Sequence, residues 1–252
     1  MKNLAARRVI ILGAQSAMAE AAARRFAADG ARLVLVGRDA ARLAEINDDL
    51  IVRGASAVHA VTLDFTQEPN PLARMHDFVD RIGGVSLILI AFGALGEQSL
   101  AENNLGHAKM LADVNFTSAM IWALAGASIL EQQSAGTLMA IGSVAGDRGR
   151  KSNYVYGAAK AGLGVFMQGL AHRLAQAGDA RAVLIKPGFV DTPMTAAFEK
   201  KGPLWASADQ IAAIIHRAAD RGGPIIYAPS FWRWIMIIIR SIPAALMHKT
   251  KL

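Results

Sequence analysis

A tyrosine and a lysine stand four residues apart in Tyr156-Gly-Ala-Ala-Lys160, and this spacing puts both side chains on one face of a helix. A phenol titrates near ~10, and a neighbouring ammonium group stabilises the phenolate and lowers the pKa toward working pH. Such a group can exchange a proton with a carbonyl oxygen, because acid–base catalysis is most efficient when the pKa approaches ambient pH. Taken alone, the same spacing is also common on solvated helix faces. Tyr154 has alanine four residues on and cannot form the pair.

A serine is placed to act on the same oxygen. Ser143 closes the apolar strand predicted at Thr137–Ile141, shortly before the helix that contains Tyr156. A hydroxyl at this point can hydrogen-bond the carbonyl that the tyrosine protonates. The three residues together predict proton transfer to or from a carbonyl oxygen.

Short apolar runs alternate with longer helical segments along the chain. Strands that are apolar throughout are typical of a parallel sheet with helices on both faces, and this alternation predicts right-handed βαβ units in a doubly wound α/β fold. The predicted strands are Arg8–Leu12, Arg32–Val36, Val58–Leu63, Leu87–Ala91, Thr137–Ile141, Ala182–Ile185 and Ile225–Tyr227. We expect one Rossmann-like domain over residues 1–230 and an apolar, basic helical tail over residues 231–252.

The first strand leads into a turn that opens a helix, Gly13-Ala14-Gln15-Ser16-Ala17-Met18-Ala19. Backbone amides and the positive end of the helix dipole at such a turn bind a pyrophosphate. Three glycines ordinarily serve this loop, whereas alanine takes two of the places here. We expect Gly13, Gln15, Ser16 and Met18 to contact a dinucleotide, although an ordinary strand–helix turn explains this segment about equally well.

The second strand ends in Gly37-Arg38-Asp39. An enzyme that selects NAD usually has an acidic residue here, and an arginine accommodates the 2′-phosphate of NADP. Arg38 therefore favours NADP(H) over NAD(H), unless it only caps a surface turn. Asp64 and Phe65 follow the third strand at the expected adenine edge, and Gly93 follows the fourth, where it permits close approach of a cofactor.

Composition excludes several other kinds of site. The 252 residues include no cysteine, which rules out thiolate metal sites, disulfides and a cysteine nucleophile. None of the six histidines stands at metal-ligand spacing, so no metal is expected. A net charge of +7 attracts anions, but the basic residues are dispersed and nucleic-acid binding is not expected. The apolar stretch Val9–Leu12 is too short for a signal peptide, which predicts a cytoplasmic protein.

The order of these parts resembles the short-chain dehydrogenase/reductase family over residues 8 to about 230. The matching parts are the glycine turn, Asn115 in a mid-chain helix, Ser143, the Tyr156/Lys160 pair, and Pro187-Gly188 after a later strand. The resemblance implies an NAD(P)(H)-dependent oxidoreductase acting on CH–OH groups and a homodimer or homotetramer. Departures are Ala17 and Ala19 in the loop, and Ala91-Phe92-Gly93 where the family usually has Asn-Ala-Gly. They bear on cofactor affinity more than on chemistry.

The same resemblance implies roles for individual residues. Asn115, Ser143, Tyr156 and Lys160 look like the family's catalytic tetrad, with Lys160 also holding the nicotinamide ribose. The stretch that lines the nicotinamide pocket is matched by Pro187, Gly188, Val190 and Thr192. A non-catalytic NADP-binding regulator is the alternative from another class, and the complete tetrad argues against it.

Within the family, several stretches resemble reductases of the 2-keto group of polyprenyl-phospho-pentofuranoses. These stretches are Ala91–Gly96, Ser143–Lys160 and the tail with Ala228-Pro229, Phe231, Arg240 and Ile242-Pro243. They imply a lipid-linked ketone as substrate. The alternative is a reductase of hydrophobic 3-oxoacyl or alicyclic ketones.

Two basic segments bear on the substrate and on location. Arg148, Arg150 and Lys151 lie between Ser143 and Tyr156, where they suit an anionic substrate; a solvated loop or a subunit contact explains them equally well. The run Phe231–Ile239 is too short to span a bilayer, but its aromatic and arginine residues suit peripheral contact with an anionic membrane at the inner face. An oligomer interface or a lid over the pocket is the alternative.

Overall fold

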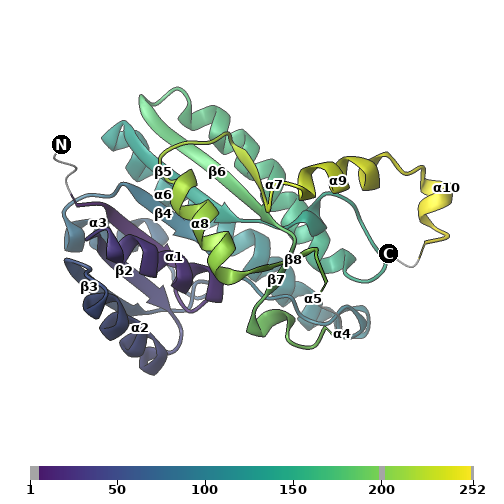
Figure 1. Cartoon of the computed structure of the whole chain (residues 1–252), viewed down its shortest axis with the longest axis horizontal. Coiled ribbons are helices and arrows are strands. Elements are labelled where there is room, and N and C mark those ends of the chain that lie inside the picture. The colour runs from purple at the N-terminus through teal and green to yellow at the C-terminus, as the bar shows by residue number, and fades with distance from the viewer. Residues whose placement is uncertain (1–5, 199–201, 251–252) are drawn as a thin grey trace.

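A computed structural model describes residues 6–198 and 202–250 of the chain. Seven parallel strands form the central sheet in the order β3-β2-β1-β4-β5-β6-β9, and two more form a small parallel sheet, β7-β8 (Figure 1). In chain order the elements are β1 (Arg8–Leu12), α1 (Ala17–Ala28), β2 (Arg32–Gly37), α2 (Ala40–Val52), β3 (Ala57–Thr62), α3 (Pro71–Ile82), β4 (Leu87–Ile90), α4 (Gln98–Asn103), α5 (Leu105–Ala112), a π-helical turn (Asp113–Ser118), α6 (Ala119–Gln133), β5 (Ala135–Ile141), α7 (Tyr154–Leu174), β6 (Asp179–Pro187), β7 (Phe189–Asp191), β8 (Trp205–Ser207), α8 (Ala208–Ala218), β9 (Ile225–Ala228), α9 (Trp232–Ser241) and α10 (Ala244–Met247).

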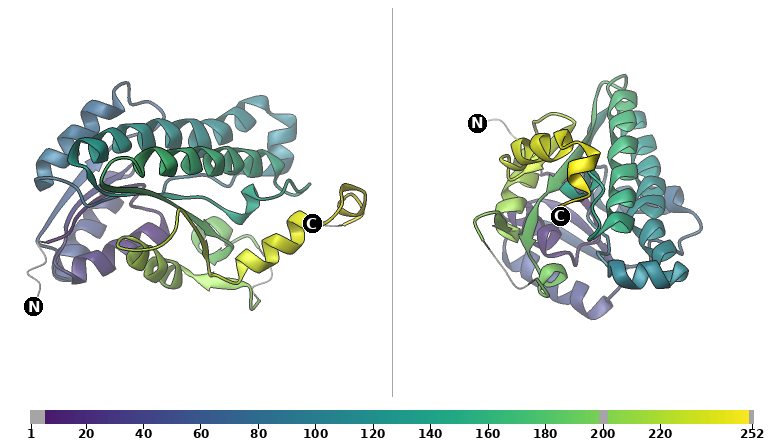
Figure 2. Two further views of the ribbon diagram at one scale, coloured as in Figure 1. Left: turned by 90° about the horizontal axis from the view of Figure 1, so that it is seen from above. Right: turned by 90° about the vertical axis from the view of Figure 1, so that its right-hand side faces the viewer.

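Two layers of helices cover the sheet (Figure 2). Helices α1, α2 and α8 pack on one face, and α3, α6 and α7 pack on the other. The residues of β1 from Val9 to Leu12 have no exposed surface, because they alternate between the two hydrophobic cores. All seven predicted strands of the doubly wound sheet are confirmed, with ends that differ by at most three residues.

The strand order reverses next to β1, and this reversal positions the site. Strand β1 pairs with β2 on one side and with β4 on the other, with Leu12 opposite Ile90. The loops that leave β1 and β4 therefore lie side by side at the carboxyl edge of the sheet. In open α/β sheets, ligands bind in the crevice at such a reversal.

Two elements of the fold have no counterpart among the predicted ones. The helical run from α5 to α6 contains a π-helical turn, Asp113–Ser118, and the short strands β7 and β8 pair beside the carboxyl edge. The run Leu105–Gln133 is long and apolar enough to cross a membrane by length and composition alone. Half of its most apolar window is buried inside the protein, as in the core helix of any doubly wound fold.

The C-terminal helices extend from the carboxyl end of the sheet, with α10 lying farthest from the body (Figures 1 and 2). One face of α9 packs inward through Trp232 and Met236, which join a small core with Val144. The opposite face exposes large apolar side chains, with Trp234 and Ile238 each 67% exposed. The tail is thus both a packing element and an apolar surface.

Candidate active site

Tyr156 and Lys160 lie in the first turns of α7, as their spacing predicts. The Lys160 ammonium donates a hydrogen bond to the carbonyl oxygen of Ile141 at 2.9 Å, at the end of β5. Its nitrogen lies 5.9 Å from the centroid of the Tyr156 ring. An ammonium has three N–H donors, so two remain for other partners.

Burial controls the protonation of this pair. It raises the pKa of Tyr156 to about 12, and a hydrogen bond with the Ser143 side chain opposes the shift. It lowers the pKa of Lys160 to about 8. The sequence predicted the opposite direction for the tyrosine, and that prediction was wrong because desolvation of the phenolate outweighs its stabilising contacts. At neutral pH the phenol is therefore intact and can donate a proton.

Asn115 is fully buried in the π-helical turn. Its amide nitrogen donates to the carbonyl oxygens of Ala94 at 2.8 Å and Leu111 at 2.9 Å, and its amide oxygen accepts from the Ala94 N–H at 3.2 Å. Such turns often occur at functional sites, and this one leaves the Leu111 carbonyl free for the side chain. Asn115 thereby fixes the loop after β4 against α5.

Gly93 lies between two of the four predicted catalytic residues, Asn115 and Lys160. A Cβ atom at Gly93 would lie 2.9 Å from the Asn115 amide oxygen and 3.5 Å from the Lys160 nitrogen. Ser143 follows β5 on the other side of the site, and its hydroxyl accepts from the Ala145 N–H at 3.0 Å. The structure thus brings together all four residues of the predicted tetrad.

The turn after β1 depends on a left-handed glycine. Gly13 has φ +89°, and a Cβ there would lie 2.4 Å from the backbone nitrogen of Phe92. The Gly13 and Ala14 amides donate to the Val36 carbonyl at 2.9 and 3.0 Å. Ser16 precedes α1 without a side-chain cap on the helix, which leaves first-turn amides for an anion. The turn therefore fits a pyrophosphate, although alanine replaces two of its glycines.

Gln15 has a structural contact that the sequence did not reveal. Its side chain accepts from the Arg38 N–H at 3.0 Å and donates to the Asp39 carbonyl at 2.8 Å. It thereby ties the phosphate turn to the turn that follows β2. The Arg38 side chain itself is exposed there, in reach of solvent or a ligand phosphate, and its charge is among the causes that lower the pKa of Asp64.

An aromatic pair borders the expected adenine edge. Phe65 and Phe92 stack with centroids 4.2 Å apart, and the Trp122 indole donates to the Phe65 carbonyl at 3.1 Å. The Asp64 carboxylate accepts from the hydroxyl and the N–H of Thr66, at 2.7 and 2.8 Å, and these bonds lower its pKa. Phe92 therefore replaces the small family residue with a ring that packs on this edge.

The predicted nicotinamide stretch follows β6. Gly188 lies directly against Trp232 of α9, since a Cβ at Gly188 would lie 1.9 Å from the indole. Val190 is buried, and Thr192 caps a short turn with Thr195. Pro187 pairs with Ala228 of β9, whereas Met18 is half-buried against the core under α1. The residue missed by the sequence is Trp232, because its packing partner is far away in the chain.

A cavity of about 540 Å³ opens in front of Tyr156. Its lining is Leu95, Gly96, Gln98, Leu111, Arg150, Ser152, Asn153, Tyr156, Phe189, Ala197, Phe198 and Trp205. Phe189 and Trp205, on the paired strands β7 and β8, stack with centroids 5.2 Å apart. These three-residue strands are too short to be recognised from a hydrophobic pattern, so the aromatic wall was missed.

The three basic residues of the loop before α7 have different environments. Arg148 donates to the carbonyl oxygens of Arg240 and Ile242, at 3.4 and 3.1 Å, and so binds the end of α9. Arg150 lines the cavity. Lys151 is exposed. Of the residues predicted to suit an anionic substrate, only Arg150 faces the cavity in front of Tyr156.

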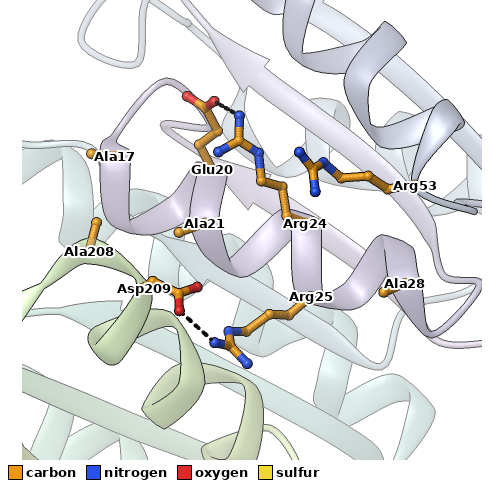
Figure 3. Close-up of a pocket in the computed structure, with 9 residues that line it drawn as sticks. All are labelled: Ala17, Glu20, Ala21, Arg24, Arg25, Ala28, Arg53, Ala208 and Asp209. Atoms are coloured by element: carbon orange, nitrogen blue, oxygen red, sulfur yellow. Dashed lines mark hydrogen bonds and ion pairs between the residues drawn. The ribbon is translucent and has the colours of Figure 1, made fainter.

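A second hollow, of about 640 Å³, lies between α1 and α8 (Figure 3). Its arginines are paired: Arg24 with Glu20 at 2.7 Å and Arg25 with Asp209 at 2.9 Å. It contains none of the predicted site residues. The cavity in front of Tyr156 is therefore the better candidate for a substrate.

The sheet is doubly wound, and the turn after β1 fits a pyrophosphate. Ser143, Tyr156 and Lys160 lie together near the carboxyl ends of β4 and β5. This combination defines a dinucleotide-dependent oxidoreductase. The family model for short chain dehydrogenases matches residues 7–202. The chain belongs to the short-chain dehydrogenase/reductase family.

Relatives and solved structures agree with this membership. An uncharacterized oxidoreductase of Streptomyces coelicolor is 34% identical over 244 residues, covering 96% of this chain and 95% of the relative. Another from Mycobacterium tuberculosis is 33% identical and covers 96% of each chain. The crystal structure of gox2181 has a TM-score of 0.80 at 22% identity, covering 91% of this chain and 97% of its own. That of levodione reductase has a TM-score of 0.78 at 23% identity, covering 88% and 95%. These two show the shared fold.

Proposed function

We propose that the protein is an NADP(H)-dependent ketoreductase in which Tyr156 protonates the carbonyl oxygen of the substrate. The observation that supports this most is that Tyr156, which lines the 540 Å³ cavity, is grouped with Ser143 and Lys160, and that Lys160 in turn lies near Asn115 across Gly93. A regulator that only bound a dinucleotide would have no use for this group.

The residues fit a dinucleotide at the reversal in strand order. The left-handed turn at Gly13 and the uncapped start of α1 suit the pyrophosphate, and the exposed Arg38 suits a 2′-phosphate. Within residues 6–198 and 202–250, Lys160 uses one of its three N–H donors, which leaves two for ribose hydroxyls. Bound NADPH would supply a hydride to the carbonyl carbon.

The chain's own residues handle the proton. The Tyr156 phenol, held neutral by a pKa of about 12, donates its proton to the carbonyl oxygen as the alcohol forms. Ser143 donates a hydrogen bond to the same oxygen, and the Lys160 ammonium stabilises the phenolate that remains. Water from the open cavity returns the proton to Tyr156 after each turnover. Asn115 holds the loop that shapes this site.

We further propose that the ketone is lipid-linked, with the 2-keto group of a polyprenyl-phospho-pentofuranose as the first candidate. The basis is the resemblance of Ala91–Gly96, Ser143–Lys160 and the tail to decaprenylphosphoryl-2-keto-ribose reductase. The aromatic wall of Phe189, Phe198 and Trp205 also suits a sugar ring or an isoprenoid. A hydrophobic 3-oxoacyl or alicyclic ketone is the competing substrate.

The surface suggests how the protein is placed in the cell. We propose peripheral contact of a cytoplasmic enzyme with an anionic membrane through α9. Phe231, Trp234 and Ile238 form an exposed apolar ridge on α9, where Arg233 is an exposed cation, and Lys249 is a further exposed cation after α10. The exposed Ile121, Leu124 and Val165 on the adjacent helices α6 and α7 suit a homodimer or homotetramer face (Figure 2).

The test of the reaction is Tyr156→Phe. The variant should bind NADPH as the wild type does, and its turnover of any accepted ketone should fall by about 10²-fold or more, the usual effect of a lost general acid. Tyr154→Phe, an exposed neighbour on the same helix, is the matched control and should retain activity. A Tyr156→Phe enzyme with a near wild-type rate would disprove the proposed role.

A further inference from the structure

Arg150 has an unusual environment for an arginine. Burial lowers its pKa, and none of the ion pairs among the described residues includes it. Its Nε atom is buried with no hydrogen-bond partner in the part of the chain that the structure describes. A charge removed from water without a partner destabilises the fold. The cost is offset when an anion in the cavity binds the part of the guanidinium that lines it.

Asn153 lines the same cavity and contains a buried hydrogen-bond acceptor that lacks a partner among the described residues. It stands at the start of α7, where asparagine usually caps the helix, yet its side chain makes no cap. Instead the Gln98 side chain accepts from the Val155 N–H at 3.1 Å. The Asn153 amide oxygen is buried and, within the described residues, lacks a donor.

The other wall of the cavity is apolar and aromatic. Phe189, Phe198 and Trp205 come from the β7-β8 side, and Leu95 and Leu111 from the loop after β4 and from α5. An aliphatic ketone would contact these side chains but would leave Arg150 and Asn153 unsatisfied. A hydroxylated ring with an anionic substituent would satisfy both polar groups and still cover the aromatic faces.

We propose that Arg150 and Asn153 form a subsite for a phosphorylated sugar, in which the Arg150 guanidinium binds the anionic oxygen and the Asn153 amide nitrogen donates a hydrogen bond to a ring hydroxyl. The inference rests on the proposed function, because it names the substrate class of the Tyr156 cavity. Both residues lie in the short segment between Ser143 and Tyr156, so the subsite would orient the ketone toward the proton donor. Arg148 has no part in it, since it binds the end of α9.

A calorimetric titration tests the subsite without any turnover. Protein saturated with NADPH is titrated with ribose 5-phosphate and with ribose, which differ only in the phosphate. The wild type should bind ribose 5-phosphate at least tenfold more tightly, the usual effect of a hydrogen bond to a charged group. Arg150→Met should remove that preference. Lys151→Met, one residue away and exposed, should keep it. Asn153→Ala should weaken both sugars by the same few-fold factor.

The outcomes separate the subsite from the reaction. Equal affinities of the wild type for the two sugars, or a preference retained by Arg150→Met, would refute the subsite. A clear preference in a protein that reduces neither cyclopentanone nor a 2-keto pentose would support the subsite and refute the proposed function. If Arg150→Met does not fold, the comparison of the two sugars with the wild type still tests the subsite. Arg150→Lys then serves as the variant and should keep part of the preference.

Discussion

Replacing Gly13 by alanine should disrupt the turn after β1 that fits a pyrophosphate. Adding a methyl group at any other position of this turn should have a smaller effect. Gly13 has φ +89°, a conformation that costs an L-residue roughly 1–2 kcal/mol. The added Cβ would also lie 2.4 Å from the Phe92 backbone nitrogen and 2.7 Å from its Cα. Backbone atoms cannot rotate away, so the loop after β4 must move.

The expected loss of stability follows from these two terms. Overpacking of this kind costs typically ~1–3 kcal/mol, and the lower entropy of the unfolded alanine chain returns about 0.4–1 kcal/mol. The free energy of unfolding should therefore fall by roughly 1–4.5 kcal/mol. Since the displaced loop also contains Gly93, NADPH binding should weaken at the same time.

Urea denaturation measured by circular dichroism gives the free energy, and fluorescence titration gives the NADPH affinity. Gly164→Ala is the matched control, because Gly164 lies within α7 and the added atom would meet only the Leu184 side chain, at an ordinary contact distance of 3.8 Å. That change should stabilise the protein by about 0.5–1 kcal/mol. A Gly13→Ala protein that unfolds at the wild-type urea midpoint and binds NADPH normally would refute the steric argument.

Three further predictions concern the cofactor, the pH profile and the tail. Arg38→Ala should remove an at least tenfold preference for NADPH over NADH, measured by titration; equal wild-type affinities would contradict the assignment of the 2′-phosphate site. Because burial depresses the pKa of Lys160 to about 8, its positive charge is complete below that pH and lost above it, so kcat/KM for ketone reduction should fall as pH rises through about 8; a rate that stays level to pH 10 would exclude the charge from the mechanism. The double change Trp234→Ser and Ile238→Ser should stop flotation with anionic liposomes while activity on a water-soluble ketone persists; altered oligomer size with unchanged liposome binding would favour a subunit interface instead.

Much of the fold follows from local pattern. The strands are unbroken apolar runs because both faces of the sheet are covered, and right-handed crossovers decide which face each connecting helix covers. The Tyr156/Lys160 pair was found from spacing within one helix, and in the structure Tyr156 lies beside Ser143 and Lys160, while Lys160 and Asn115 meet at Gly93. Geometry within one strand or one helix can therefore be predicted from residues that are close in the sequence.

What could not be predicted depends on contacts between distant segments. Trp232 belongs to an apolar run that was predicted to contact a membrane, a second subunit or the pocket, and the sequence did not indicate that its indole packs on Gly188. Arg148 and Arg150 are two residues apart, but one binds the end of α9 and the other faces the cavity. The raised pKa of Tyr156 also results from its three-dimensional surroundings, because burial has no signature in the spacing of residues.

The π-helical turn Asp113–Ser118 makes the site depend on the number of residues as well as on their types. A turn with i→i+5 bonding holds one residue more than an α-helical turn. Losing any one of these residues would allow α5 and α6 to merge into one regular helix. The flanking helices would keep their orientation, because a π turn holds its extra residue without rotating them, and only the wide turn that presents Asn115 to the Ala94 loop would be lost. Asn115 would leave the Ala94 loop, although no functional side chain had been altered. A one-residue deletion at this turn should therefore leave the fold intact but disrupt the site. Substitution of single residues would not reveal this dependence.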